Sequence, residues 1–251
     1  MGSVDLERAA RTAGLAAPVR WDEVTGSTNA TAAILAREGA PEWTLVGAGH
    51  QTAGRGRRDR TWTDRPGGAL MVSVVLRPAL EPVDAGLLSL LAGAAWAEAI
   101  EGVGGLTVRC KWPNDLMAGD DKVGGILAES LVEGDRLASV VIGSGINLLA
   151  PEGLDGAAGV GTDVDATDLL GAFLAAFADG YRPEVPGFAD DVIARWTRRS
   201  ATLGRQVAAV DAAGARIEGT ATGLDAHGGL ILEHADGSRR TVTSDDLVHL
   251  R

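Results

Sequence analysis

The distribution of apolar and polar positions changes near residue 202, and this change divides the chain into two regions. Before it, apolar stretches long enough for helices alternate with shorter runs rich in Val and Leu. After it, only short alternating runs remain, such as QVAAV and RIEGTATGL, separated by turn signals such as AHGG and ADGS. We therefore predict a large first domain over residues 1–201 and a small all-β domain, of barrel or sandwich type, over residues 202–251.

Four stretches of the first region have the length and composition of helices. The first begins near Thr28, where several side chains can cap a helix, and it ends before Gly39 and Pro41. The other three are predicted over residues 84–101, 166–180 and 186–199. Residues 1–20 form a short polar lead in this interpretation, too short for an independent DNA-binding domain.

Five stretches of the first region have the composition of strands, namely residues 43–49, 69–78, 106–112, 122–133 and 137–148. The last two flank Glu133-Gly134-Asp135, a turn signal that predicts a hairpin. Residues 50–60 form a polar loop rich in Gly and Arg. Residues 151–162 show little periodicity and are predicted to be a loop.

Charge and composition narrow the class of protein. The net charge is −11 and the sequence pI is about 4.8, which argues against duplex DNA as the main partner because phosphate contacts require basic surface. The single cysteine, Cys110, excludes an intramolecular disulfide, fits a reducing compartment and is interpreted as an inert buried residue.

The chain also lacks the usual signals for membrane insertion or export. The N-terminus has no long apolar core of the signal-peptide kind. The most apolar run, residues 86–100, includes Ser89 and Glu98 and is shorter than the roughly 20 residues of a membrane span. We therefore predict a buried helix there, and a soluble, cytoplasmic protein.

Residues 50–62, HQTAGRGRRDRTW, carry the clearest candidate chemistry. Four arginines fall within six residues, with glycines between them, namely Arg55, Arg57, Arg58 and Arg60. Glycine lets backbone amides approach an anion, and arginine binds phosphate through two parallel hydrogen bonds. The loop therefore suits a nucleotide phosphate, although a solvated basic loop has the same composition. The spacing matches neither the G-x-x-x-x-G-K-[ST] loop nor G-x-G-x-x-G.

Three further segments combine glycines with polar side chains: residues 111–125, 143–147 and 26–29. Lys122 begins a strand beside Gly124 and Gly125, so it can reach a ligand that packs on bare backbone. Asn147 can bind a phosphate or ribose, and Ser27 and its neighbours can bind a polar head group at a helix N-terminus. Each segment by itself is equally compatible with an ordinary turn, structural glycines in a strand, or a helix cap.

Taken in order, these strings resemble the biotin–protein ligases, also called biotin acetyl-CoA-carboxylase ligases. The matching strings are GSTN (26–29), HQTAGRGRRDRTW (50–62), KWPNDL (111–116), KVGGIL (122–127) and GSGINL (143–148). The resemblance covers essentially residues 20–251 and implies the short class, which lacks an N-terminal DNA-binding domain. It implies an α/β (α+β) catalytic domain over residues 1–201, related to class II aminoacyl-tRNA synthetases. In that fold a mixed sheet carries helices on one side, and a C-terminal SH3-like β-barrel follows over residues 202–251.

The resemblance also implies an activity. Such a ligase adenylates biotin with ATP to biotinyl-5′-AMP, with Mg²⁺, and transfers the biotin to a lysine of a biotin carboxyl carrier domain in an acyl-CoA or pyruvate carboxylase. The implied state is a monomer or a weak homodimer that binds no DNA and no membrane. The alternatives are a lipoate or octanoate ligase on the same fold, an inactive biotin-binding sensor, and a nucleic-acid binder built on the arginine loop.

The residues implied to act fall into three groups. Those implied to be catalytic are Lys122, Arg57, Arg60 and Asp115. Those implied to bind biotin are Ser27, Thr28, Asn29, Gln51, Gly54, Arg55, Trp62, Lys122, Gly125, Gly143 and Gly145. Those implied to bind ATP or the adenylate are Arg57, Arg60, Trp62, Lys111, Asn114, Lys122, Asn147 and Arg251. The implied set contains no definite metal ligand.

One position departs from the family pattern. The loop often reads G-R-G-R-R-G-R in the family, and Asp59 stands here in place of the last glycine. A carboxylate among the arginines reduces backbone freedom at that point. Loop mobility and retention of the intermediate are the properties that this change affects.

Overall fold

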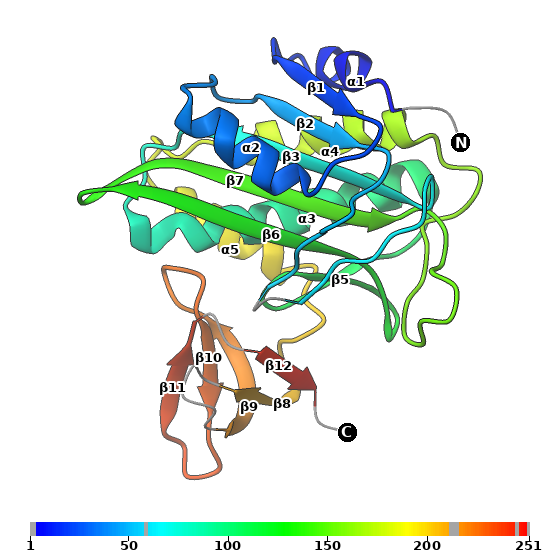
Figure 1. Cartoon of the computed structure of the whole chain (residues 1–251). Helices are drawn as coiled ribbons and strands as arrows, with labels where there is room; N and C mark the ends of the chain where they lie inside the picture. The colour runs from blue at the N-terminus through cyan, green and yellow to red at the C-terminus, as the bar shows by residue number, and fades with distance from the viewer. Residues whose placement is uncertain (1–3, 58–59, 211–215, 244–245, 250–251) are drawn as a thin grey trace.

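The computed structural model describes residues 4–57, 60–210, 216–243 and 246–249. A large sheet with helices packed on it forms the first region, and a small separate sheet forms the second (Figure 1). The predicted change in architecture is present: α5 ends the first region at Thr197, and the first strand of the second begins at Gln206.

Seven strands build the large sheet, in the order β1-β2-β3-β7-β6-β5-β4. Their bounds are β1 Val19–Asp22, β2 Leu45–Ala48, β3 Ala69–Leu76, β4 Arg109–Lys111, β5 Asp115–Ala118, β6 Asp121–Glu133 and β7 Arg136–Asn147. Only the β1–β2 pair is parallel, and the other neighbours are antiparallel, so the sheet is mixed as expected. The predicted hairpin is the long β6–β7 pair, and its register places Gly125 opposite Gly145.

The helices cover both faces of the sheet, so the implied arrangement on one side is wrong. The helices α1 Leu6–Thr12, α3 Gly86–Gly104, α4 Ala166–Gly180 and α5 Phe188–Thr197 share the main core, and the short 3₁₀ helix η1 Pro82–Ala85 leads into α3. Helix α2, Thr28–Arg37, packs Ala32 and Ala36 on Val46, Val75 and Val141 of the opposite face (Figure 1). The physical reason is that β2 and most of β3 are buried on both faces, which requires cover on both.

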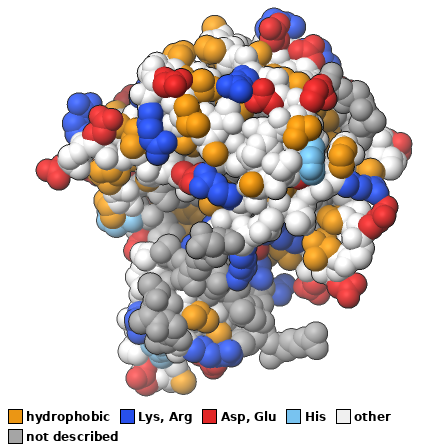
Figure 2. Space-filling view, in the orientation of Figure 1, with side chains coloured by type: hydrophobic (Ala, Val, Ile, Leu, Met, Phe, Trp, Pro, Cys, Tyr) orange, Lys and Arg blue, Asp and Glu red, His pale blue; other side chains and the backbone are white. Residues whose placement is uncertain are grey.

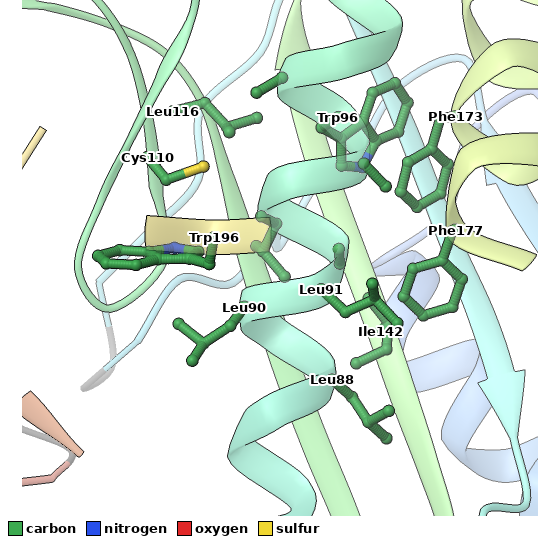
Figure 3. Close-up of a cluster of buried hydrophobic side chains, with 14 of the residues drawn as sticks. Leu88, Leu90, Leu91, Trp96, Cys110, Leu116, Ile142, Phe173, Phe177 and Trp196 are labelled. Atoms are coloured by element: carbon green, nitrogen blue, oxygen red, sulfur yellow. The ribbon is translucent and has the colours of Figure 1, made fainter. Parts of the chain in front are cut away.

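Helix α3 lies at the centre of the main core. Trp96 stacks on Phe173 of α4, with ring centroids 4.0 Å apart, and Phe177 continues the cluster (Figure 3). The segment Pro82–Gly104 is long and apolar enough to cross a membrane by length and composition. Here it is a core helix, because most of its apolar side chains are buried against other elements of the fold. It runs beyond the predicted stretch, to Gly104.

Two elements near the N-terminus were missed. Residues 1–20 were interpreted as a polar lead, but α1 packs Leu6, Ala9 and Ala10 into the core, and Val19 begins β1. The charged residues between these apolar positions concealed the helical stripe. The third missed element is β5, whose four residues are too few for an alternating pattern to show.

The small sheet has five antiparallel strands in the order β11-β10-β9-β8-β12. They are β8 Gln206–Val210, β9 Arg216–Leu224, β10 Leu230–Glu233, β11 Arg239–Val242 and β12 Asp246–His249. The turn between β9 and β10 reaches the first region, where His227 Nδ1 lies 2.6 Å from Asp84 Oδ1. On the face shown in Figure 2, acidic and basic side chains are interspersed rather than gathered into a basic stripe.

Candidate active site

A cavity of about 170 Å³ lies where the N-terminus of α2, the arginine loop of residues 50–62 and strands β5, β6 and β7 meet. It brings together most of the residues singled out in the sequence, although these are spread over more than 100 positions. Those lining it are Ser27, Thr28, Asn29, Gln51, Arg55, Arg57, Arg60, Trp62, Lys111, Asn114, Asp115, Lys122, Gly125, Gly143 and Gly145. Gly54 and Asn147 are not among the lining residues, and Arg251 lies outside the described residues.

One part of the cavity is lined by Ser27, Thr28, Asn29 and Gln51, and the fully buried Ser73 contacts two of them from outside the cavity. We call these five residues the head wall. Gln51 Oε1 accepts hydrogen bonds from Thr28 N at 2.7 Å and from Thr28 Oγ1 at 3.2 Å. Ser73 Oγ is 2.9 Å from Thr28 Oγ1 and donates to Asn29 Oδ1 at 2.7 Å. The residues at 27–29 are at most 5% exposed. The head wall is therefore an uncharged, buried and internally hydrogen-bonded surface.

Ser73 was not found from the sequence. It is the one hydroxyl residue inside the buried run of β3, ALMVSVVL, and that interruption was the available signal. Its hydrogen bonds to Thr28 and Asn29 span 45 and 44 residues, so only the folded sheet brings it to them. It fixes the orientation of the Asn29 amide.

Two of the predicted glycines leave room for protein side chains. A Cβ atom on Gly143 would stand 1.9 Å from Asn29 Oδ1, and one on Gly145 would stand 2.6 Å from the Trp62 indole. Only glycine therefore allows Asn29 and Trp62 to reach these positions. Trp62 Nε1 is buried and has no hydrogen-bond partner among the residues that the structure describes. The indole N–H is thus a buried donor beside the cavity that Trp62 lines.

A second part of the cavity, which we call the charged wall, consists of Arg57, Arg60, Asn114, Asp115 and Lys122. Lys122 Nζ lies 2.6 Å from Asp115 Oδ1, and their side chains are 37% and 27% exposed. Gly125 pairs with Asp115 across β5 and β6, and a Cβ there would come within 3.3 Å of Lys122 Nζ. The ammonium group therefore lies over bare backbone, next to one carboxylate.

Asn147 lies behind this wall and supports it. Its Nδ2 donates to the carbonyl of Lys122 at 3.4 Å and to that of Ala158 at 3.1 Å. The Lys122 amide donates to the carbonyl of Gly156 at 2.8 Å, so the irregular segment 151–162 also holds the start of β6. In this geometry Asn147 positions the backbone of Lys122, and its implied contact with an adenylate stays a prediction.

The arginine loop folds back on itself as a narrow hairpin. Trp62 N donates to the carbonyl of Gly54 at 2.9 Å, and Gly56 N donates to that of Arg60 at 2.7 Å. A Cβ on Gly54 would stand 2.6 Å from the Trp62 carbonyl, so this close approach requires glycine. Arg57 Nη1 reaches Asn114 Oδ1 at 3.4 Å. Arg58 and Asp59 lie outside the described residues.

The ends of the loop are joined by a hydrogen-bonded contact between His50 and Asp64 that the sequence did not indicate. His50 Nδ1 lies 2.9 Å from Asp64 Oδ2, and the Asp64 side chain has no exposed surface. The two residues flank the loop on either side. The pair therefore sets the distance between the two loop ends.

Trp112 lines the cavity and connects it to the small sheet. It is 3% exposed, its backbone amide donates to Thr202 Oγ1 at 3.0 Å, and its Nε1 donates to the carbonyl of Gly228 at 3.0 Å. Its neighbour Pro113 follows a cis peptide bond. Sequence reasoning noted the string KWPND but assigned Trp112 no role.

Cys110 lies directly behind the charged wall, next to Lys111 and Trp112 in the sequence. Burial raises the pKa of its thiol to about 12, so the group stays protonated near neutral pH. Only the thiolate is strongly nucleophilic. The interpretation of Cys110 as an inert buried residue agrees with this environment.

Comparison with known proteins gives two family matches and close relatives. Residues 22–147 match the model of the biotin/lipoate A/B protein ligase family, and residues 202–249 match that of the biotin protein ligase C-terminal domain. The chain is 35% identical to the biotin–[acetyl-CoA-carboxylase] ligase of Mycobacterium tuberculosis over 242 residues, covering 90% of this chain and 87% of that one. It is 34% identical to the bifunctional ligase/repressor BirA of Bacillus subtilis over 235 residues, covering 90% and 72%.

Among solved structures, the biotin protein ligase of Aquifex aeolicus in complex with biotin and ATP superposes with a TM-score of 0.77. The superposition covers 93% of this chain and 99% of that one, at 24% identity. At that identity the likeness establishes the shared fold. It extends over both regions of the chain.

Proposed function

The chain belongs to the biotin/lipoate A/B protein ligase family, and we propose that it is a biotin–protein ligase. It forms biotinyl-5′-AMP from biotin and ATP and transfers the biotin to a lysine of a carrier domain. In this proposal residues 1–201 form the catalytic domain and residues 202–251 an accessory β domain. The C-terminal Arg251 would reach the nucleotide from there.

One observation supports this function above the others: a buried uncharged group of side chains and a group of charged side chains line the same cavity. The ureido head of biotin has both donors and acceptors for Thr28, Asn29 and Gln51, whereas the dithiolane of lipoate has neither. A dithiolane placed against this polar wall would remove its water without returning hydrogen bonds, so the site disfavours an analogue that lacks a polar head. The head wall therefore favours biotin within a family that also serves lipoate.

In the first step the biotin carboxylate attacks the α-phosphorus of ATP, and pyrophosphate leaves. Both reactants are anionic, so the barrier depends on cancelling their repulsion and on alignment. Lys122 would contact the carboxylate and the α-phosphate, and Arg57 and Arg60 would hold the phosphates. Lys111 and Asn114 lie beside them on the same side of the cavity. Trp62 would cover the ligands.

We propose Mg²⁺ as the ion that accompanies ATP. Among the residues that the structure describes, no group of three or more His, Cys, Asp or Glu side chains could hold a metal ion. Mg²⁺ usually binds through one or two carboxylates together with substrate phosphates, and Asp115 with Asn114 fits that pattern. When bound with the triphosphate, the ion lowers the negative charge that the biotin carboxylate approaches.

In the second step a neutral lysine amine attacks the carbonyl of biotinyl-5′-AMP, and AMP leaves. Lys122 would stabilise the charge that develops on the carbonyl oxygen. Asp115, at 2.6 Å from Lys122 Nζ, would orient the incoming amine or accept its proton. The release of Asp115 from Lys122 is therefore a part of the second step.

The acceptor in this proposal is the biotin carrier domain of an acyl-CoA or pyruvate carboxylase, in the cytoplasm. The name of the Mycobacterium tuberculosis relative refers to such a carboxylase. The single free cysteine is buried, which suits a reducing compartment. We propose a monomer or weak homodimer as the working assembly.

The test is transfer to a purified biotin carrier domain in the presence of biotin, ATP and Mg²⁺. We expect the mass of the carrier to rise by one biotinyl group, and a carrier with its acceptor lysine replaced by arginine to stay unchanged. Lipoate in place of biotin is expected to give no product. Transfer of lipoate but not of biotin would assign the chain to the other branch of the family.

A further inference from the structure

Glu129 lies on β6 outside the cavity, yet it contacts two residues that line it. Its Oε2 accepts a hydrogen bond from Asn29 Nδ2 at 2.8 Å and from Arg55 Nη2 at 3.0 Å. These partners lie 100 and 74 residues away in the sequence. One carboxylate oxygen thus joins the head wall, the arginine loop and the central sheet.

The contact with Asn29 completes the hydrogen bonding of that amide. Asn29 Oδ1 accepts from Ser73 Oγ, while Nδ2 donates to the carbonyl of Leu127 at 3.1 Å and to Glu129. The side chain of Asn29 has no space to move toward β7, because it already fills the position that a Cβ on Gly143 would take. Without Glu129, the amide keeps only one of its two acceptors and its orientation is less fixed.

The contact with Arg55 anchors the first arm of the loop hairpin. Arg55 pairs with Thr61 as an antiparallel bridge, so fixing Arg55 to β6 also fixes the returning arm. The ion pair is half exposed, with side chains 48% and 33% accessible, and such pairs contribute little to overall stability. Its effect is therefore expected on the position of the loop rather than on folding.

From these contacts we infer that Glu129 is a positioning residue that links biotin recognition by the head wall to closure of the arginine loop. The inference rests on the proposed function and adds a residue and a coupling to it. One carboxylate thus supports the Asn29 amide in the head wall and Arg55 in the loop. Removing the carboxylate therefore weakens biotin binding and loosens the cover over the intermediate.

Two variants at this position separate the two contacts. Glu129→Ala removes both, and Glu129→Gln keeps an oxygen that can accept from Asn29 while losing the charge that holds Arg55. Glu133→Ala is the matched control, because it removes the same charge from the exposed far end of the same strand. The readouts are KM and kcat for biotin in ATP–pyrophosphate exchange, and the rate at which free biotinyl-5′-AMP leaves the protein.

For Glu129→Ala we expect KM for biotin to rise about tenfold with kcat within about twofold, and release of the adenylate to be about tenfold faster. For Glu129→Gln we expect a KM near that of the wild type and release that is still faster. Glu133→Ala is expected to match the wild type in both. Trypsin is expected to cleave the arginine loop faster in both Glu129 variants.

Unchanged KM and release in Glu129→Ala would overturn the inference, and so would a matched fall in kcat and stability without a KM effect. If Glu129→Ala does not fold, the comparison of Glu129→Gln with the wild type decides, because it predicts faster release at unchanged KM. The failure of the proposed function is a different result: the wild-type chain itself would then show no exchange that depends on biotin.

Discussion

The two sides of the cavity differ in how far they are organised before a ligand binds. The head wall is buried and its polar groups are already paired, through Gln51, Thr28, Ser73 and Asn29. The charged wall is 27% exposed at Asp115 and 37% at Lys122, and its contact from Arg57 to Asn114 is long at 3.4 Å.

This difference matches the chemical role that we propose for each wall. A neutral head group is recognised by donors and acceptors that are fixed in advance, because reorganising them on binding would lower the affinity. Phosphates and leaving groups change position and charge during the reaction, so the groups that neutralise them must rearrange. Lys122 in particular has to exchange Asp115 for substrate oxygens.

The largest effect is expected for Lys122→Ala, which removes the central cation of the charged wall. Exchange of pyrophosphate into ATP should fall by about 10²- to 10³-fold, as for the loss of one preorganised transition-state donor. Biotin binding, measured by calorimetry without ATP, should change far less because the head wall is intact. Near-normal exchange in a variant with unchanged unfolding would show that the charged wall has been assigned to the wrong residue.

Gly143→Ala disturbs the head wall instead of the charged wall. The added Cβ would stand 1.9 Å from Asn29 Oδ1, so the amide has to leave its position. We expect biotin affinity to fall by at least about tenfold, whereas the ATP-binding groups stay in place. Gly102→Ala is the control, since its Cβ meets nothing within 4 Å. Equal biotin affinity in the two variants would contradict the account of the head wall.

Arg57→Ala removes a cation that would hold the adenylate in the cavity, and it leaves the residues of the head wall unchanged. Release of free biotinyl-5′-AMP should become about tenfold faster, because a charged contact to the intermediate is lost. KM for biotin should stay close to the wild-type value. Trapping the released adenylate with hydroxylamine measures the rate. A raised KM with unchanged release would place Arg57 on the biotin side instead.

Trp112→Phe tests the link between the charged wall and the small sheet. It keeps a ring in the core but removes the donor to the Gly228 carbonyl, and the expected loss is about 1 kcal/mol in the free energy of unfolding. Trp21→Phe is the control, since its Nε1 donates to the side chain of Glu23 near the surface. Urea titrations of both variants measure the difference, and equal losses would show that the contact does not hold the small sheet.

The smallest effect concerns Cys110, whose reactivity measures how tightly the core beside β4 is packed. Since burial raises its pKa to about 12, the thiol is protonated at pH 8 and should not react with a thiol reagent in the native protein. In urea the pKa returns to its ordinary range and the thiol should react fully. Rapid reaction in the native state would show that this side of the sheet opens readily.

Much of the fold could be predicted from local pattern. The β6–β7 hairpin has a turn signal and α2 has cap-forming residue types at its start, and both elements are present. Ser27 is the N-cap residue of α2, but its side chain makes no capping hydrogen bond. Helix α1 was missed because its short apolar stripe lies among charged residues. The position of α2 on the opposite face was also missed, because local pattern does not reveal which face of a sheet a helix covers.

The sequence predicted most of the residues that line the candidate site, but not the hydrogen bonds that hold them in place. The family strings led to most of the residues that line the cavity. They did not include Ser73 or Glu129 and gave no role to Trp112, and the contacts of these three residues join segments from 44 to 116 residues apart. Hydrogen bonds over such separations leave no local spacing to detect, so they require the folded chain. The predictions for Asp59 and Arg251 concern positions outside the described residues.

The most direct test of the account is ATP–pyrophosphate exchange by the purified chain, with biotin and lipoate as parallel substrates. The account predicts exchange with biotin and none above background with lipoate, because only biotin pairs with the head wall while its carboxylate meets the charged wall. Exchange with lipoate alone, or with neither acid in a protein that binds biotin, would contradict it.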